Sequence, residues 1–316
     1  MTETEQKAVL TLCLMAAFAD GQDERERAQI KRIAESLAPG SALDLAALYQ
    51  DVLLKRRSLE QVAADLTTPE AAQLAYEMAV CVCDADGAAS PAESAFLERV
   101  RAALKLDSKQ AAAFAERAAA VASVPLPARV GASPAEPEVL PPERIDTAAL
   151  DKMILNYSIL NGALELLPQS LASMAIIPLQ MKMVYRVGQA YGFELDRGHI
   201  KDLLATLGVG LTGQYVEQIG RKLIGGLLKT VGGGLLGGLG SVATGAGFSF
   251  ATTYALGQVA KQYYAGGRTI DAAQLKQVFA SMFEQAKGLQ GRYATQIEQK
   301  ARTIDVNQIV SMVREQ

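Results

Sequence analysis

Six of the eleven prolines lie in one short stretch, Pro125 to Pro142, and this stretch most constrains what the chain can fold into. Proline fixes φ and has no N–H to donate, so a segment this rich in proline is extended and semi-stiff and cannot continue a helix. It therefore predicts a linker, residues 122–145, between two independently folding parts. A chain of 316 residues is long enough for two domains of ordinary size.

Before the linker, apolar residues recur at helical spacing in seven short segments, and no alternating strand pattern competes with them. Each segment begins at a Ser, Thr or Asp, whose side-chain oxygen can accept hydrogen bonds from the free amides of a first helical turn. Two of these starts are followed by proline, which the first turn of a helix tolerates. The expected starts are Thr4, Asp23, Ser41, Ser58, Thr68, Ser90 and Ser108.

Helical segments also dominate after the linker. Asp146 to Leu167 predicts a helix that ends at the following proline, and Gln169 to Tyr191 predicts a helix kinked at Pro178. A short helix is expected over Asp196 to Leu207, and amphipathic helices return from Asp271. The fold class predicted for the whole chain is all-α. The expected parts are a helical domain (1–121), the linker (122–145), a Gly-rich apolar helical domain (146–267) and C-terminal amphipathic helices (268–316).

A short acidic pattern occurs twice before the linker: an apolar helix, Ala-Asp-Gly, a gap, Glu and a second apolar helix. Asp23 and Ser90 each lie three residues before a glutamate, which is the spacing of a capping box, so helix capping and turn formation alone can explain the pattern. The alternative is that the carboxylates form an acidic surface for a partner or hold a divalent cation such as calcium. The candidate metal ligands are Asp20, Glu26, Asp86 and Glu93, with Glu24 and Asp84 as auxiliary ligands.

The repeated pattern, over roughly residues 3–121, resembles the TerB-like domain of tellurite-resistance proteins. The resemblance implies a compact helical domain with an acidic surface, linked to metal sensing or stress response and to metal binding. The first repeat is one residue shorter between Asp and Glu than the second, which argues against equivalence of the two sites. The matching positions are Asp20, Gly21 and Glu26 in the first half and Asp86, Gly87 and Glu93 in the second.

Residues Thr230 to Ala260 form a run of 31 residues that has no charge and contains nine glycines. A single helix of this length would span about 46 Å, more than the roughly 30 Å hydrocarbon core of a bilayer. Basic residues flank the run on both sides, which favours a re-entrant hairpin or a membrane-surface segment. They are Arg221, Lys222 and Lys229 before it and Lys261 and Arg268 after it. The hairpin would turn near Ser241 to Gly247. The alternative is a pair of buried helices packed through glycine. The close-packing candidates are Gly233, Gly234, Gly237, Gly238, Ser241 and Gly245.

Three segments, Asn156–Asn161, Ile177–Gly192 and Thr253–Ala260, resemble in this order the YcjF-like domain of unknown function that often follows Era-like GTPase domains. The resemblance covers roughly residues 150–265. It implies membrane association and partnership with a GTPase or a stress system, and it carries over no catalytic residues. An acidic helical domain stands here where the GTPase would be, so a GTPase acting in trans is left open.

The inventory of reactive side chains argues against an enzyme. Cys13, Cys81 and Cys83 cannot all pair, and their helical neighbours are apolar, so we expect buried thiols in a reducing compartment. His199 is the single histidine and is expected on the surface or in a cap, without an HExxH, GxSxG or Cys/His pattern. Gly208 to Gly213 matches GxGxxG but follows a predicted helix instead of a strand, so no dinucleotide site is expected.

Charge is unevenly distributed: residues 1–121 carry 13 basic and 19 acidic side chains, whereas residues 146–316 carry 16 and 12. The basic part is the one expected to approach anionic lipid. Dispersed basic residues without an aromatic stripe argue against a nucleic-acid partner. The N-terminus shows no secretory signal pattern, so a cytoplasmic location is expected.

These observations predict a non-enzymatic adaptor or sensor associated with the cytoplasmic face of the membrane, acting in a metal, tellurite or envelope stress response. No cofactor is expected apart from a divalent cation such as calcium. The expected partners are the membrane, a second copy of the chain and another protein, with a GTPase as one candidate. The alternatives are a soluble homo-oligomeric scaffold packed through the Gly-rich helices and a regulatory partner of a GTPase.

Overall fold

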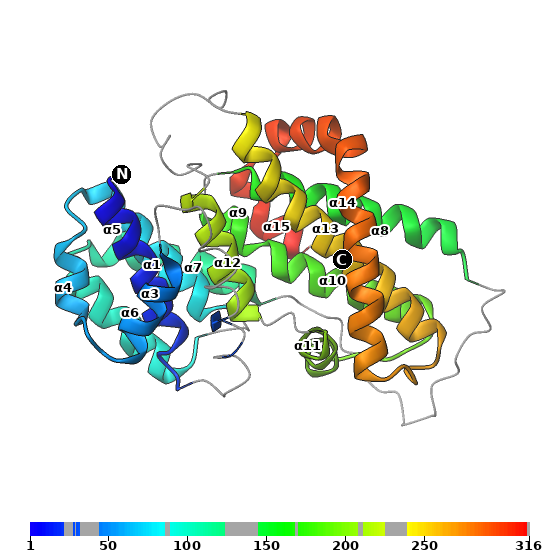
Figure 1. Cartoon of the computed structure of the whole chain (residues 1–316), viewed down its shortest axis with the longest axis horizontal. Helices are drawn as coiled ribbons and strands as arrows, with labels where there is room; N and C mark the ends of the chain where they lie inside the picture. The colour runs from blue at the N-terminus through cyan, green and yellow to red at the C-terminus, as the bar shows by residue number, and fades with distance from the viewer. Residues whose placement is uncertain are drawn as a thin grey trace. The chain divides into compact units, whose positions relative to one another are not determined.

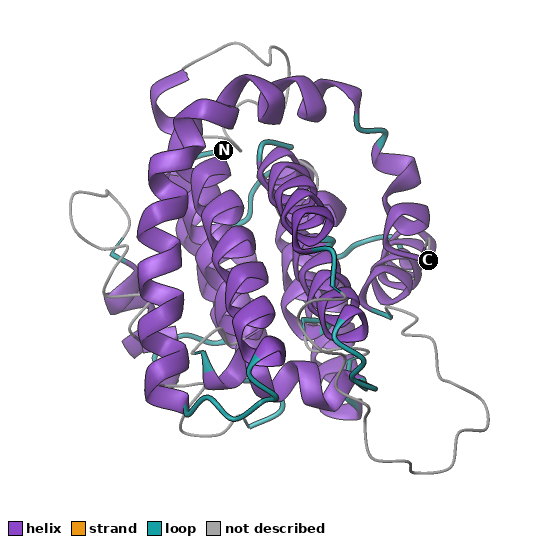
Figure 2. Ribbon diagram, turned by 90° about the vertical axis from the view of Figure 1, so that its right-hand side faces the viewer, coloured by secondary structure: helices purple, strands orange, loops and turns teal. Residues whose placement is uncertain are grey.

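The computed structural model describes residues 1–21, 28, 30–31, 44–85, 89–123, 145–167, 170–207, 211–224 and 239–314. All regular structure in these ranges is helical, and no strand occurs in them (Figures 1 and 2). The all-α prediction is therefore confirmed. The proline-rich stretch that defines the predicted linker lies outside the described residues from 124 to 144.

Contacts divide the chain into two compact units, each built from more than one chain segment. Unit 1 contains residues 1–123 together with 168–174 and 210–242. Unit 2 contains 124–167, 175–209 and 243–316. Two segments that follow the proline-rich stretch in the sequence thus belong with the N-terminal helices.

Unit 1 is built around two helices, α1 (Glu3–Ala17) and α5 (Pro69–Cys83), which pack along each other. The other helices of the unit are α3 (Leu45–Leu53), α4 (Leu59–Ala64), α6 (Pro91–Ala103), α7 (Ser108–Ala122), α9 (Ser170–Met174) and α12 (Leu211–Ile224). Of these, α3, α4, α6 and α12 contact α1, whereas α6, α7, α9 and α12 contact α5 (Figure 1). The core of unit 1 is therefore completed by α9 and α12, which come from the second half of the sequence.

Unit 2 contains α8 (Thr147–Glu165), α10 (Ile176–Ala190), α11 (Arg197–Thr206), α13 (Leu239–Ala265) from residue 243 on, α14 (Ala272–Thr303), the 3-10 helix η3 (Val306–Gln308) and α15 (Ile309–Arg314). Helix α8 packs against α10 and α14, and α10 also packs against α11 and α15. Aromatic pairs join α13 to α14, with ring centroids 5.7 Å apart for Phe248 and Phe283 and 5.9 Å apart for Phe250 and Tyr293.

Helix starts follow local capping chemistry. Thr68 and Ser90 cap α5 and α6, and in both helices a proline occupies the first turn, where its missing N–H breaks no helical hydrogen bond. Both caps were predicted, which confirms that these starts are local properties of the sequence. The other confirmed starts are Ser58, Asp146, Asp196 and Asp271.

Two predicted starts are wrong because a better cap precedes each of them. Helix α1 is capped by Thr2 instead of Thr4, since Thr2 forms a reciprocal capping box with Glu5. Helix α7 is capped by Asp107 instead of Ser108, and the Asp107 carboxylate accepts from two backbone amides. Asp23 and Ser41 lie outside the described residues, and α3 is capped by Asp44.

The helix predicted over 169–191 is divided into α9 and α10, which are separated at Ala175. Pro178 lies in the first turn of α10, so the prediction of a kink at Pro178 within one long helix is wrong. Because proline lacks an N–H, Pro178 cannot donate to the carbonyl oxygen of Met174, four residues earlier. Within unit 1 this carbonyl accepts instead from the hydroxyl of Tyr215 on α12, at 2.5 Å. The Tyr215 side chain thus supplies a hydrogen-bond donor for a carbonyl group at the C-terminal end of α9.

The described part of the charge-free run is a single helix, α13. It passes unbroken through Ser241–Gly247, so the predicted hairpin turn there is wrong. From Gly247 to Ala260 most residues are buried, as the buried-helix alternative requires. In the described ranges no helix combines the length and apolarity needed to cross a bilayer. Ser241 and Gly245 lie in α13, whereas Gly233, Gly234, Gly237 and Gly238 lie outside the described residues.

Gly257 marks a close approach of α13 to α8. A Cβ atom at this position would lie 2.6 Å from Cγ2 and 2.8 Å from Cγ1 of Ile154, which is fully buried. Isoleucine is stiff at χ1 and cannot swing aside. We therefore expect Gly257→Ala to lower the free energy of unfolding in urea by about 1–3 kcal/mol.

The matched control is Gly288→Ala in the exposed part of α14, where a Cβ would have no atom within 4 Å. This change should be neutral or should raise the free energy of unfolding by up to about 1 kcal/mol, because Ala has the higher helix propensity. Equal stability of the two variants would show that Gly257 is not tightly packed.

Candidate functional site

The acidic residues predicted for the first domain lie where α1 and α5 end and where α6 begins. Asp20 is exposed in the turn after α1, which Gly21 closes with a φ of +79°. Asp84, 4% exposed, caps the end of α5, and its Oδ1 accepts from the Ala89 N–H at 3.0 Å. Glu93, 9% exposed, accepts at 2.8 Å from the N–H of the residue that caps α6. Two of the three carboxylates therefore also have a capping role.

The same three carboxylates act on one thiol, that of Cys83. Burial raises the pKa of Cys83, and the negative charges of Glu93, Asp84 and Asp20 raise it further. We call Asp20, Asp84 and Glu93 the acidic cluster. Among the residues with described positions, no group of three or more His, Cys, Asp or Glu side chains has the geometry of a metal site. The remaining candidates, Glu24, Glu26 and Asp86, lie outside the described residues.

All three cysteines are buried and free, as predicted. Burial raises the pKa of the Cys13, Cys81 and Cys83 thiols. A thiol of raised pKa holds little thiolate at neutral pH, and the thiolate is the nucleophilic form. The cysteines therefore serve as small packing residues.

A buried polar strip joins α9 to α5 and α12 within unit 1. The Ser170 hydroxyl donates to the Glu77 carboxylate at 2.7 Å, and the Lys222 ammonium donates to the Ser173 hydroxyl at 2.5 Å. Lys222 is 3% exposed, so its expected position as a basic flank of a membrane segment is wrong. The strip was not predicted, because its partners are 93 and 49 residues apart and no local pattern relates them.

Glu5 joins the N-terminal ends of α1 and α5 and was not predicted as a special residue. Its Oε2 accepts from the Thr2 N–H at 2.8 Å, while its Oε1 accepts from the Thr68 N–H at 3.1 Å and from the hydroxyls of Thr67 and Thr68. These bonds, with that of Thr2 the largest, lower the pKa of Glu5 to about 2 against the opposing effect of burial. The Thr2-x-x-Glu5 spacing could have indicated half of this arrangement.

His199 is a helix-capping histidine, as expected. The Asp196 carboxylate accepts from the His199 N–H at 2.8 Å, and His199 Nδ1 lies 2.8 Å from the same oxygen. The backbone N–H is the largest cause of the lowered pKa of Asp196. The contact stabilises the start of α11.

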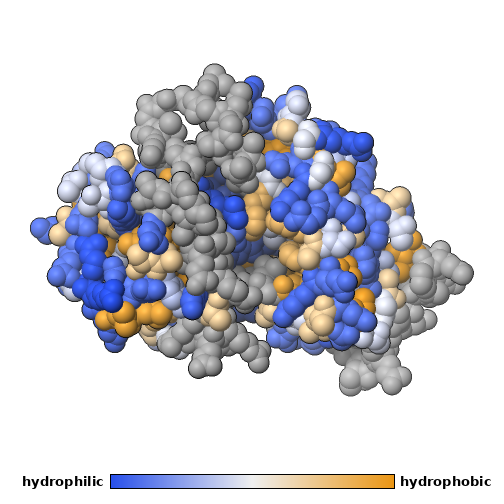
Figure 3. Space-filling view, in the orientation of Figure 1, coloured by the Kyte–Doolittle hydropathy of each residue, from blue (hydrophilic) through white to orange (hydrophobic). Residues whose placement is uncertain are grey.

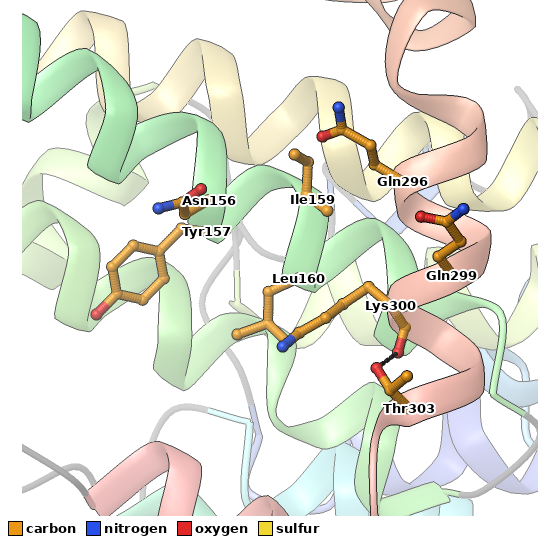
Figure 4. A pocket seen from close by; sticks show the side chains of 8 residues that line it. All are labelled: Asn156, Tyr157, Ile159, Leu160, Gln296, Gln299, Lys300 and Thr303. Carbon is orange, nitrogen blue, oxygen red and sulfur yellow. Dashed lines mark hydrogen bonds between the residues drawn. The ribbon is translucent and has the colours of Figure 1, made fainter.

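A groove of about 600 Å³ lies between α8 and α14 (Figure 4). Its floor is partly apolar, and Lys300 extends from α14 toward Leu160 on α8. A groove of this size and mixed polarity can hold a small organic molecule. Its lining contains the Lys300 ammonium and the Tyr157 hydroxyl but neither a carboxylate nor a histidine. The lining residues are Asn156, Tyr157, Ile159, Leu160, Gln296, Gln299, Lys300 and Thr303.

Exposed apolar surface is limited. On the face drawn in Figure 3, hydrophobic residues form small areas separated by hydrophilic ones. In the described part of the chain, the exposed large hydrophobic side chains are those of Leu53 and Leu54 at the end of α3, at 42% and 60% exposure. Two adjacent leucines are ordinary for a protein surface and do not define a docking patch.

The fold of unit 1 defines it as an all-α bundle with carboxylates gathered at its helix ends. The family model described as Tellurite resistance protein TerB matches residues 6–116, from within α1 to within α7. This match supports the first resemblance: residues 6–116 are similar to the TerB family of tellurite-resistance proteins. The YcjF-like resemblance stays a prediction. No curated protein and no solved structure matches the chain.

Proposed function

We propose that the chain is a non-enzymatic adaptor or sensor in a metal or tellurite stress response, and that its two acidic turns, with Asp20, Glu26, Asp86 and Glu93 as candidate ligands, take a divalent cation such as calcium. The TerB match over residues 6–116 supports a role in a metal or tellurite stress response. The observation that carries the cation proposal is the acidic pattern that occurs twice in the sequence, at Asp20 and Glu26 and again at Asp86 and Glu93. Carboxylate oxygens at turns are ligands that calcium prefers.

The three carboxylates of the acidic cluster differ in how they are held. Asp84 and Glu93 are held by backbone N–H groups, which fixes their positions. Asp20 is exposed in a turn and is the first member that a cation from solution meets. A cation bound at the acidic turns would stiffen them. Stiffening of these turns is the signal that we propose a protein partner reads.

Calcium titration of the full chain tests the proposal by its melting temperature. A ligand that binds only the folded state at 100 times its Kd stabilises that state by about 2.7 kcal/mol, a rise of several degrees. Asp20→Asn should reduce this rise, because it removes one charged ligand without disturbing a buried contact. The control Glu116→Gln changes an exposed carboxylate on α7 and should leave the rise unchanged.

Two results would overturn the cation proposal. One is a constant melting temperature of the full chain at millimolar calcium. The other is an equal rise in the wild type and in Asp20→Asn, which would place the bound cation elsewhere.

Insertion of the Gly-rich run into a membrane is not part of this proposal. From Gly247 to Ala260 the run is mostly buried in unit 2, and Gly257 packs against Ile154 of α8. Burial in a protein core uses the same apolar surface that a bilayer would contact. Association with a membrane surface, a GTPase or a second copy of the chain stays a prediction.

A further inference from the structure

The single histidine of the chain lines a second pocket of unit 2, with a volume of about 270 Å³. Its walls come from α11, from the end of α13 and the turn that follows, and from the start of α14. Polar groups of His199, Asp202, Tyr263 and Arg268 line it together with apolar side chains that include Leu203 and Leu275. None of these residues belongs to the acidic cluster, so the pocket is independent of the proposed cation site.

Local backbone structure fixes the polar walls. The capping contact with Asp196 holds the Nδ1 side of His199 in place. At the end of α13, Gly267 and Arg268 both adopt positive φ, +65° and +66°, and the Arg268 N–H donates to the Tyr263 carbonyl at 2.9 Å. Positive φ is unfavourable for a residue with a side chain, so Arg268 is held in an uncommon conformation at the edge of a pocket.

Asp202 and Arg268 carry opposite charges and both line this pocket, but they do not form an ion pair with each other. In the described ranges, neither the Asp202 carboxylate nor the Arg268 guanidinium makes a hydrogen bond or an ion pair. The two groups therefore remain more than 4.0 Å apart although they line the same pocket. Leu203 and Leu275, 4% and 3% exposed, supply apolar surface. A ligand that carries both a carboxylate and an ammonium group can pair with both charges at once.

We propose that this pocket binds a small zwitterion, an α-amino acid with an apolar side chain. Arg268 and His199 receive its carboxylate, Asp202 receives its ammonium group, and its side chain packs on Leu203 and Leu275. The volume lies just below the roughly 300–1,000 Å³ of sites for drug-sized ligands, which fits a ligand as small as an amino acid. A purely anionic ligand would leave the Asp202 carboxylate facing a like charge.

Because the chain has one histidine, NMR of the full chain labelled with ¹³C-histidine gives one imidazole signal that reports on the pocket. L-leucine should shift this signal in a saturable manner. Acetate, which supplies the carboxylate alone, and isobutylamine, which supplies the ammonium group alone, should bind at least about tenfold more weakly.

Substitutions separate recognition of the two charges from a general effect on folding. Arg268→Gln and Asp202→Asn should each weaken leucine binding at least about tenfold, and Arg268→Lys should restore part of it. Arg302→Gln, an exposed change in the last turn of α14, should bind like the wild type. Unchanged melting temperatures verify that the variants are folded.

Absence of a saturable shift with leucine would overturn the proposal, as would wild-type binding by both charge variants. An equal response to acetate and leucine would show a site for carboxylates alone and would also overturn it.

Discussion

Replacing Glu5 by Gln should lower the free energy of unfolding by about 3 kcal/mol at neutral pH. The expected loss is large because one carboxylate holds the starts of both α1 and α5, and its side chain is only 1% exposed. The pKa of Glu5 falls from 4.5 to about 2 on folding. Each pKa unit corresponds to about 1.4 kcal/mol of preference for the charged form in the folded state.

The lowered pKa of Glu5 also determines how its stabilising effect changes with pH. Since folding lowers the pKa of Glu5, the stabilisation is fully present above about pH 4.5 and is lost as the pH falls toward 2. Urea unfolding of the wild type and of Glu5→Gln between pH 7 and pH 2 should therefore show two stabilities that converge in acid.

Glu3→Gln is the control, because Glu3 lies on the same first turn but is exposed and paired with Lys7 at the surface, 2.7 Å away. Its loss should stay below about 1 kcal/mol. A difference between the wild type and Glu5→Gln that does not change with pH would show that the charge of Glu5 has no part in the stabilisation.

The fragment of residues 1–123 should fail to form the native bundle, although it contains the whole TerB match. It lacks α12, whose Tyr215, Val216, Ile219 and Leu223 are at most 1% exposed. Burial of each such side chain contributes about 1.5–3 kcal/mol, so the loss is comparable with the roughly 5–15 kcal/mol that stabilises a whole domain. We expect poor dispersion in NMR spectra, binding of a hydrophobic dye and no cooperative thermal transition.

Addition of a synthetic peptide that spans residues 209–226 tests whether α12 is the missing element. It should restore cooperative melting in a concentration-dependent manner, whereas the same peptide with Ile219→Ala should restore it less well. A fragment that melts cooperatively at the temperature of the full chain would show that α12 adds little to the core.

Features set by neighbouring residues could be predicted from the sequence. Thr68 followed by Pro69, and Ser90 three residues before Glu93, give correct helix starts because a cap acts within one turn. Errors in such local features are small: the N-cap of α1 is Thr2, two residues before the predicted start at Thr4. The burial of the three cysteines was likewise visible in the helical spacing of their apolar neighbours.

Features that depend on distant residues could not be predicted in the same way. Apolar spacing shows that α12 has a buried face but does not say which helices cover that face. Its contacts with α1 and α5, and the hydrogen bond from Tyr215 to Met174, join segments that no pattern relates. For the candidate site, the acidic residues were visible as a repeat. That three of them raise the pKa of the Cys83 thiol could be seen only from the fold.

Because unit 1 is built from separate chain segments, it cannot finish folding during biosynthesis until the last of these segments has been made. Residues 1–123 leave the ribosome before α9 and α12 have been synthesised. The helical bundle of unit 1 therefore cannot be completed before the chain has been made up to Ile224, where α12 ends. At about 5–20 residues per second, roughly 100 further residues take about 5–20 seconds to make. During this interval the apolar faces of α1 and α5 that α12 will cover are open to chaperones and to other nascent chains. Slower translation between residues 124 and 224 would lengthen that exposure.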